Sequence, residues 1–457
     1  MSSPDHATSR AARIVTAVVS SRFTLWLAFV LVHLVLGLLN LFGPGLPLGD
    51  VTIVYKLWSD QVLSAHYWVG IDGPFVYPIL AIFPMLAASV LGPTVYASTW
   101  LSLVMVINCV AFAWLTGWGR TGRNIVAGWW WVAFLLLLGP IALGRIDSIT
   151  VPIAIIGMLL VVARPVAATI ILTIATWIKV WPAALLGAIV IAHRQRASVV
   201  TWAVIVSAGI VGIALTYGSG ANILSFVTQQ AGRGLQVEAP VTTPWLWLSA
   251  VGWPDTFVYY NQDILTYQVT GPGADFVSMI MTPVLAVAAL ATCALGVLAA
   301  RRRPPVTELL PLLSLALVTC LIAFNKVGSP QFMSWLAVPV LFGLVTAHAG
   351  GGRSFRSPAI IAAVIGALTQ AIYPYLYADY LSLDGQLLIA GTIRNILILV
   401  LFGWAVHALW ELWRGGDWPE EDRLDEDALP VATTSAGSTV DTWPFERREH
   451  GRLDEHP

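Results

Sequence analysis

Residues 23–42 read FTLWLAFVLVHLVLGLLNLF, a stretch that contains no charged side chain. A helix of about 20 apolar residues is long enough to cross the hydrocarbon core of a membrane. Because lipid offers the backbone no hydrogen-bond partners, such a stretch must be helical. Arg10, Arg13 and Arg22 precede it, and this positive charge predicts a cytoplasmic N-terminus. The length of the stretch and the lack of a small-residue cleavage site favour an uncleaved anchor over a signal peptide.

Similar apolar stretches recur along most of the chain. The 457 residues are 57% hydrophobic and only 11% charged, with a mean hydropathy of +0.77. A soluble domain carries about 25% charged residues, so this chain is not solvated on all sides. The sequence therefore predicts an all-α polytopic membrane protein with about twelve transmembrane helices and both termini in the cytoplasm. The predicted spans after the first are 76–92, 95–115, 125–143, 149–163, 166–192, 199–217, 276–300, 309–324, 332–349, 358–377 and 387–410.

Arginine clusters between the later spans support this topology. The clusters at 301–303 and 353–356 fall on the cytoplasmic side, as the positive-inside rule requires. Arg120, Arg123 and Arg164 fit badly, because the same topology places them outside the cell.

The C-terminal tail differs in composition from the rest of the chain. Of the 25 acidic residues, 12 lie after Gly416, among Pro, Ser and Thr, so we expect a disordered tail. The chain thus divides into a cytoplasmic segment (1–22), a transmembrane domain (23–412) with external loops at about 43–77 and 218–275, and an acidic cytoplasmic tail (413–457).

Composition also excludes several classes of function. Cys109, Cys293 and Cys320 lie within apolar spans, so they predict neither a disulfide framework nor a metal site. Basic residues occur in short clusters at span ends, where membrane orientation explains them without nucleic-acid binding. We expect no metal and no other cofactor.

The first external loop contains the strongest catalytic candidate. Asp50 follows the first span by a few residues, and a partly desolvated carboxylate at a membrane surface is suited to general-base work. The structural alternative is that a Gly-Asp pair simply begins a helix. Tyr55 and Lys56 in this loop, and Tyr77 at its end, are candidate substrate contacts.

Charged residues also lie within the apolar part of the chain. Arg145 and Asp147 separate two apolar spans; Arg145 could bind phosphate, or the two side chains could simply pair with each other. Lys179 lies inside the stretch 166–192, and an intramembrane Lys marks a functional site by default. Alternatively, Lys179 could satisfy carbonyls freed by Pro182, and the stretch could be a broken or re-entrant helix.

Two further segments carry candidate anion ligands. In the large loop, glycines flank Arg233 and allow a close approach to phosphate, although Arg233 could instead pair with Glu238. The segment NKVGSPQF (325–332) offers Lys326, Ser329 and Gln331 as a phosphate clamp, or forms a generic turn. A short apolar piece, 244–253, predicts an interfacial or re-entrant helix.

Taken together, these residues resemble the GT-C class of polyprenyl-phosphate-sugar-dependent glycosyltransferases, and within it the bacterial glycosyltransferase family 87. The matching pieces, in chain order, are Asp50 with Tyr55, Tyr77-Pro78, Gly144-Arg145-Ile146-Asp147, Trp177-Ile178-Lys179-Val180-Trp181-Pro182, Arg233-Gly234-Leu235-Gln236-Val237-Glu238, and Lys326 with Ser329-Pro330-Gln331-Phe332.

The resemblance implies a GT-C-type helical bundle with a large first extracytoplasmic loop. It also implies an inverting transfer of a sugar, mannose in the best-known members, from a polyprenyl-phosphate donor. Its catalytic acid in the first loop matches only Asp50. The chain departs from the family at Ile79, where a second Pro is common, and lacks the His-rich loop of the phosphatidylinositol mannosyltransferases near Ser329.

The expected function is a multi-pass glycosyltransferase of the bacterial cell membrane, with Asp50 as base and its active site outside the cell. Its partners would be the donor, a lipid or glycolipid acceptor and membrane lipids, but no nucleic acid. A transporter or lipid flippase is the alternative, although related halves with midplane charges are not evident. An inactive scaffold would not explain the buried charges. The expected donor-phosphate ligands are Lys326, Arg233, Lys179 and Arg145, and the expected substrate contacts are Tyr55, Lys56, Tyr77, Asp147, Glu238, Ser329 and Gln331.

Overall fold

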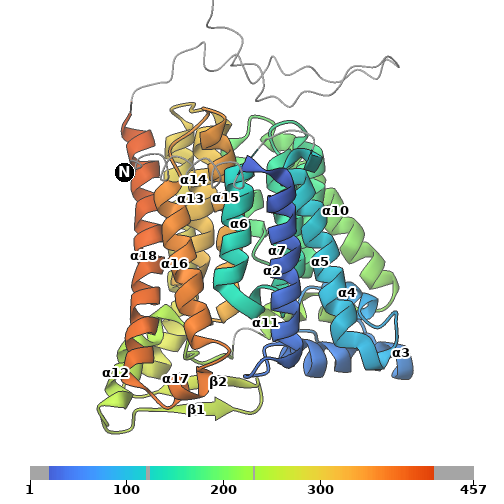
Figure 1. The fold of residues 1–457 in the computed structure, drawn as a ribbon, viewed down its shortest axis with the longest axis vertical. Helices are drawn as coiled ribbons and strands as arrows, with labels where there is room; N and C mark the ends of the chain where they lie inside the picture. Colours follow the sequence, from blue (N-terminus) through green and yellow to red (C-terminus); the bar gives the residue numbers. More distant parts are fainter. Residues whose placement is uncertain (1–19, 120–123, 230–231, 416–457) are drawn as a thin grey trace, which may run out of the picture.

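The computed structural model describes residues 20–119, 124–229 and 232–415, which form a bundle of helices (Figure 1). Within these ranges, eight helical segments are long and apolar enough to cross a membrane, which confirms a multi-pass helical membrane protein. They are α2 (Arg22–Phe42), Pro93–Leu115 with α5 (Tyr96–Leu115), Ile125–Ala142 with α6 (Ile125–Leu138), α10 (Arg196–Thr216), α13 (Ala274–Ala300), α14 (Val306–Ala323), Pro330–His348 with α15 (Ala337–His348), and α18 (Gly385–Arg414).

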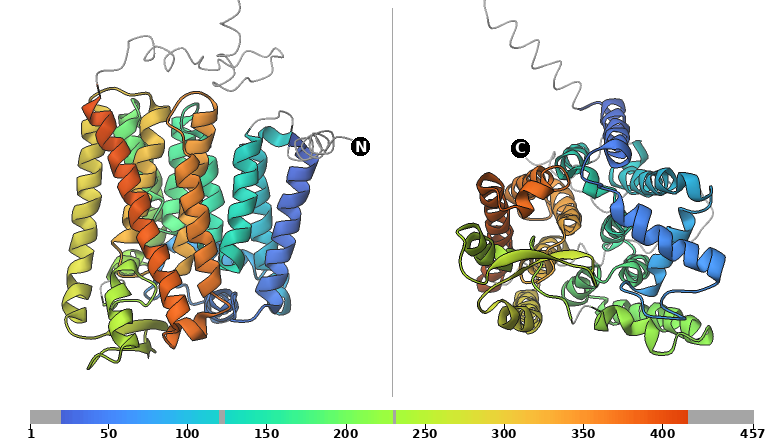
Figure 2. Two further views of the ribbon diagram at one scale, coloured as in Figure 1. Left: turned by 60° about the vertical axis from the view of Figure 1, so that its left-hand side comes forward. Right: turned by 90° about the horizontal axis from the view of Figure 1, so that it is seen from below.

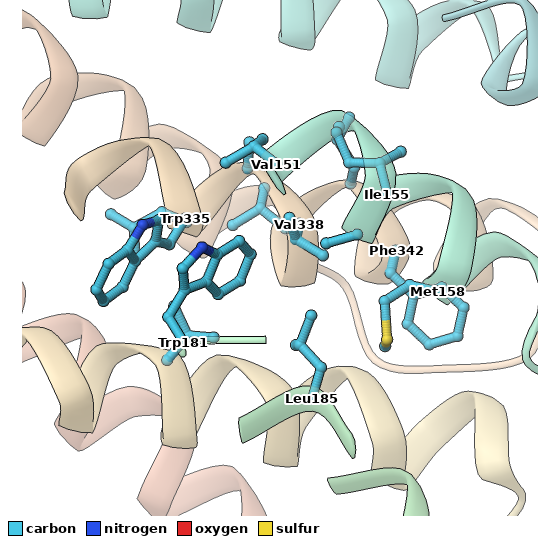
Figure 3. Packing of buried hydrophobic residues seen from close by; sticks show 14 of the residues in the cluster. Val151, Ile155, Met158, Trp181, Leu185, Trp335, Val338 and Phe342 are labelled. Carbon is cyan, nitrogen blue, oxygen red and sulfur yellow. The ribbon is translucent and has the colours of Figure 1, made fainter. Parts of the chain in front are cut away.

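Four shorter apolar helices complete the bundle: α7 (Asp147–Leu160), α8 (Pro165–Ile178), α9 (Ala183–Ala192) and α16 (Arg356–Ile372). Helices α14 and α15 are buried over most of their length, whereas most residues of α10 and α13 are at least partly exposed, as expected of helices that face lipid. Figure 3 shows how side chains of α7, α9 and α15 interlock at the centre of the bundle. The core is therefore built around α7, α14 and α15.

The two ends of the bundle differ in structure (Figures 1 and 2). One end, here called the terminal end, carries the start of α2 and the end of α18. The other, the loop end, carries α3 (Lys56–Ala65), α12 (Thr243–Ala250), α17 (Tyr377–Leu381) and a hairpin of β1 (Phe257–Asn261) and β2 (Thr266–Thr270). Both loops that the sequence predicts to be external thus lie at the same end of the bundle.

The large loop contains one element that was predicted and one that was not. Helix α12 forms where the short apolar piece 244–253 predicted a helix. The antiparallel hairpin, in which Phe257 pairs with Thr270, was not anticipated.

The predicted span 76–92 is wrong. In this stretch a single 3₁₀ turn (Ile79–Ala81) leads into α4 (Ile82–Ala87), and the helix goes no further. About nine helical residues rise roughly 15 Å, half of the thickness of the hydrocarbon core. Pro78 fixes the chain in an extended conformation before the turn, which shortens the helix. The chain therefore enters and leaves this segment at the loop end.

The stretch 166–192, predicted as one span, is broken into α8 and α9. Lys179 is extended (φ −149°, ψ 134°), and α9 starts only after Pro182, so the alternative of a broken helix is confirmed. Because Lys179 returns to within 3.6 Å of Asp147 at the start of α7, α7 and α8 run in opposite directions. Arg164, between them, therefore lies at the terminal end, which removes its misfit with the other arginines.

Several predictions fall on other parts of the chain. Arg120 and Arg123, most of the N-terminal segment 1–22 and the tail after Gly415 lie outside the described residues. Helix α18 continues to Arg414, two residues into the predicted tail.

Candidate functional site

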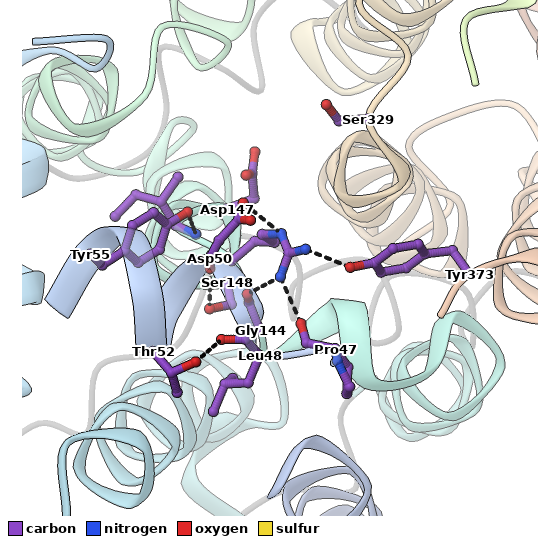
Figure 4. A network of polar contacts seen from close by, with 12 residues as sticks. Pro47, Leu48, Asp50, Thr52, Tyr55, Gly144, Asp147, Ser148, Ser329 and Tyr373 are labelled. Carbon is purple, nitrogen blue, oxygen red and sulfur yellow. Dashed lines mark hydrogen bonds and ion pairs between the residues drawn. The ribbon is translucent and has the colours of Figure 1, made fainter. Parts of the chain in front are cut away.

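Asp50 begins a short π-helix (Asp50–Tyr55) that leads into α3 at the loop end of the bundle. Its carboxylate is 43% exposed, and Oδ2 lies 3.0 Å from Nε of Arg145 (Figure 4). The side chain is thus held by an ion pair on one side and open on the other. This arrangement suits a base that must meet a substrate hydroxyl better than it suits a simple helix cap.

Arg145 is almost fully enclosed, and its guanidinium is occupied by protein groups. Nη1 donates to the carbonyls of Pro47 (2.7 Å) and Gly144 (2.8 Å), and Nη2 donates to the hydroxyl of Tyr373 (2.6 Å). With Nε on Asp50, every nitrogen of the side chain has a partner. The structure therefore does not favour the expectation that Arg145 binds phosphate; the guanidinium instead fixes the orientation of Asp50.

Tyr55 and Tyr77 connect this pair with the rest of the site. Their hydroxyls lie 3.4 Å apart, and the Tyr55 hydroxyl accepts a hydrogen bond from the backbone N–H of Ile146 (3.2 Å). Burial, followed by the proximity of Tyr77 and Asp50, raises the pKa of Tyr55 well above its usual value. Tyr55 is therefore a neutral hydrogen-bonding group, and both predicted tyrosines do lie at the site.

Asp147 and Lys179 form a second ion pair, almost completely buried. Nζ of Lys179 lies 3.6 Å from Oδ2 of Asp147 and 4.6 Å from the centre of the Tyr77 ring. Oδ1 of Asp147 accepts a hydrogen bond from Nε1 of Trp335 (2.6 Å). The partner of Lys179 is thus a carboxylate rather than carbonyls freed by Pro182. Neither Arg145 nor Asp147 pairs with the other, contrary to the alternative drawn from their spacing.

Arg233 and Lys326 differ from the two ion pairs, because both are cations and Lys326 lies in the electrostatic field of Arg233. Burial lowers the pKa of Arg233. Burial and then the positive charge of Arg233 lower the pKa of Lys326, which is 7% exposed. Tyr77 is close enough to Arg233 to influence its charge, so this pair adjoins the Tyr55–Tyr77 contact. Two adjacent cations in a partly buried place are equipped to bind an anion with more than one charge.

Two other predicted substrate contacts, Glu238 and Lys56, have partners outside the group of cations. Glu238 is buried and accepts a hydrogen bond from the Tyr377 hydroxyl, so the alternative of an Arg233–Glu238 pair is not found. Burial raises the pKa of Glu238. Lys56 pairs with Asp60 one turn later on the exposed surface of α3 (2.7 Å). It therefore does not belong to the cluster.

Ser329 and Gln331 lie in the buried turn before α15. Ser329 Oγ is 3.5 Å from Oε1 of Gln236, and the carbonyl of Gln331 accepts from Ser334 Oγ (2.6 Å). Ser329 therefore faces the large loop, whereas Gln331 helps to shape the turn.

Sequence reasoning missed Tyr373, which contacts Arg145 from the end of α16, and Gln268, which lies in the unpredicted hairpin. Neither residue has a charge or a sequence neighbour that would have identified it. Among the described residues, no group of three or more His, Cys, Asp or Glu side chains is placed to hold a metal ion.

Comparisons with protein-family models, with curated proteins and with solved structures each gave no match.

Proposed function

We propose that this protein is a membrane glycosyltransferase that transfers a sugar, with mannose as the favoured candidate, from a polyprenyl-phosphate donor to a hydroxyl of a lipid or glycolipid acceptor. One observation carries the proposal. A half-exposed carboxylate, held by an enclosed Arg145, lies at the same end of the bundle as the adjacent cations Arg233 and Lys326. This is the equipment for deprotonating a hydroxyl beside a phosphate leaving group.

In the proposed reaction the acceptor oxygen attacks the anomeric carbon of the donor while Asp50 takes the hydroxyl proton. The bond between the anomeric carbon and the phosphate oxygen breaks, and the phosphate leaves with the electron pair. A single displacement of this kind inverts the anomeric configuration. Arg233 and Lys326 stabilise the charge that develops on the phosphate, so the leaving group needs no general acid. Lys179 and Asp147 form an ion pair with little net charge, so in this proposal they position Tyr77 beside the site.

The proposal includes the placement of the chain in a bacterial cell membrane. The eight long helices would cross the membrane and the four shorter ones would run between the same two ends of the bundle, which gives twelve apolar helices in the described part of the chain. The terminal end would face the cytoplasm. Arg164 directly precedes α8, Arg196 begins α10 and the cluster 301–303 follows α13. These helix ends would lie at the terminal end, as the positive-inside rule requires. The loop end, with Asp50, would then face outward, where lipid-linked sugars meet acceptor lipids.

A transporter or lipid flippase is the second candidate, because α8 and α9 are interrupted beside a buried ion pair. Interrupted helices near charged groups also form the ion and substrate sites of transporters. Such a protein would move a lipid-linked sugar across the membrane without breaking the bond to phosphate.

The purified chain in lipid nanodiscs, given polyprenyl-phosphate-mannose and bacterial acceptor lipids, tests the proposal. We expect sugar transfer to an acceptor lipid, and loss of at least about a hundredfold in rate for Asp50→Asn, which cannot accept the proton. Lys56→Gln is the matched control from the same loop and should transfer normally. Translocation of the intact donor in sealed vesicles, without transfer, would establish the transporter instead.

A further inference from the structure

Next to Arg233 and Lys326, the large loop presents a small polar surface formed by Gln236 and Gln268. The segment Gly234–Val237 runs antiparallel to β2, with Val269 N–H donating to the Leu235 carbonyl (3.0 Å). Gln236 pairs with Gln268 across this contact, so both side chains lie on the same face. At its other edge, Gln236 N–H donates to the carbonyl of Lys326 (3.0 Å). Gln236 thus lies directly beside the backbone of Lys326, and Gln268 lies beside Gln236.

The opposite face of this segment is apolar and packed against the bundle. Leu235 and Val269 contact residues of α12 and α13, and Val237 and Tyr267 contact residues of α17 and α18. Because side chains alternate along extended chain, Gln236 and Gln268 must point the other way. Ser329, 3.5 Å from Gln236 Oε1, lies on that side.

Both glutamines are buried, and Gln268 has an unused donor. Gln268 is 1% exposed; its Oε1 accepts from the Tyr259 hydroxyl (2.7 Å), but its Nε2 has no partner in the part of the chain that the structure describes. Nε of Arg233, adjacent to Gly234, is likewise buried without a partner there. A buried donor without an acceptor costs about 1–3 kcal/mol. Two such donors at one place indicate a ligand that offers oxygen atoms.

We propose that Gln268 and Gln236 bind the hydroxyl groups of the sugar while Arg233 and Lys326 bind the phosphate attached to it. An amide carries both a donor and an acceptor, as a hydroxyl does, whereas a guanidinium or ammonium can only donate and prefers an anion. This inference rests on the proposed function and adds the residues that recognise the sugar. It predicts that removing the Gln268 donor affects sugar-bearing ligands selectively.

Binding of two groups of probes to the full chain in nanodiscs tests this. The first probe is farnesyl phosphate, and the second group is farnesyl phosphate carrying mannose, glucose or arabinose. In the wild-type protein at least one sugar should strengthen binding. Gln268→Met keeps the length of the side chain but removes the donor, so it should weaken binding of that sugar probe about tenfold and farnesyl phosphate less than twofold. Gln386→Met, on the exposed start of α18, is the control.

Gly234→Ala provides a second variant that leaves Gln268 in place. A Cβ at this position would lie 2.5 Å from Oε1 of Gln268 and so displace its amide. The same selective loss is expected, and preserved binding of farnesyl phosphate shows that the protein is folded. If no sugar strengthens binding, or if both variants weaken all probes equally, the inference is overturned while the phosphate site stands. If the wild type does not bind farnesyl phosphate either, the proposed function itself fails.

Discussion

The charged groups at the loop end fall into two regions that balance charge in opposite ways. In the first, each cation forms an ion pair with a carboxylate: Arg145 Nε lies 3.0 Å from Asp50 Oδ2, and Lys179 Nζ lies 3.6 Å from Asp147 Oδ2. In the second, Arg233 is close enough to Lys326 to lower the pKa of that lysine. Cations paired within the protein serve to position other groups, whereas adjacent like charges gain most from an external anion.

The largest effect is expected for the buried pair. Asp147→Asn or Lys179→Met leaves one buried charge without its partner and should lower the free energy of unfolding by about 3–5 kcal/mol. The double variant should recover much of that loss, since it leaves no unpaired charge. Denaturant unfolding in detergent measures all three. A loss in the double variant equal to the sum of the two single losses would show that the two charges are not coupled.

A large effect on turnover, but not on donor binding, is expected for Arg145. Arg145→Gln releases Asp50 from its ion pair and should slow sugar transfer about a hundredfold, a loss typical of a misplaced general base. Arg145→Lys should rescue little, because one ammonium cannot reach the four groups that the guanidinium contacts. A rise in KM with unchanged kcat would instead identify Arg145 as a phosphate ligand.

A smaller effect is expected on the pH dependence of phosphate binding. The pKa of Lys326 lies below that of an ordinary Lys, so its charge is lost at lower pH as the solution becomes alkaline. Above about pH 7 a phosphate monoester is already a dianion, so its own charge stays constant. Affinity for farnesyl phosphate should therefore fall with rising pH in the wild type. Lys326→Arg should abolish this fall; an unchanged profile would exclude Lys326 as its cause.

The smallest effect is expected at the surface pair Lys56–Asp60. Both side chains are partly exposed on α3, and exposed pairs of this spacing contribute about 0.3–0.5 kcal/mol. Lys56→Ala should change stability by no more than that and leave sugar transfer intact. A strong loss of sugar transfer would show that Lys56 contacts the substrate after all.

The sequence predicted the helical membrane fold because long apolar stretches have only one way to cross lipid. It failed at 76–92, where the hydropathy is that of a span but the helix that follows Pro78 is too short to cross a membrane. It missed the hairpin because the alternation of apolar and polar residues in 257–270 is weak. For the site it named charged residues, several of which the structure brings together, but it did not predict their partners. Asp50 finds Arg145 far along the chain, and Tyr373 completes the contact from α16, a proximity that only tertiary packing creates.

The most direct test of the difference between the two regions is a titration of farnesyl phosphate against matched Gln variants. Arg233→Gln and Lys326→Gln should each weaken binding about tenfold or more, since a hydrogen bond to a charged group contributes about 1.5–3 kcal/mol. Arg145→Gln, in which the lost cation was already paired with Asp50, should weaken binding less than twofold. If Arg145→Gln weakens binding as much as the other two, or if neither Arg233→Gln nor Lys326→Gln has an effect, the account is contradicted.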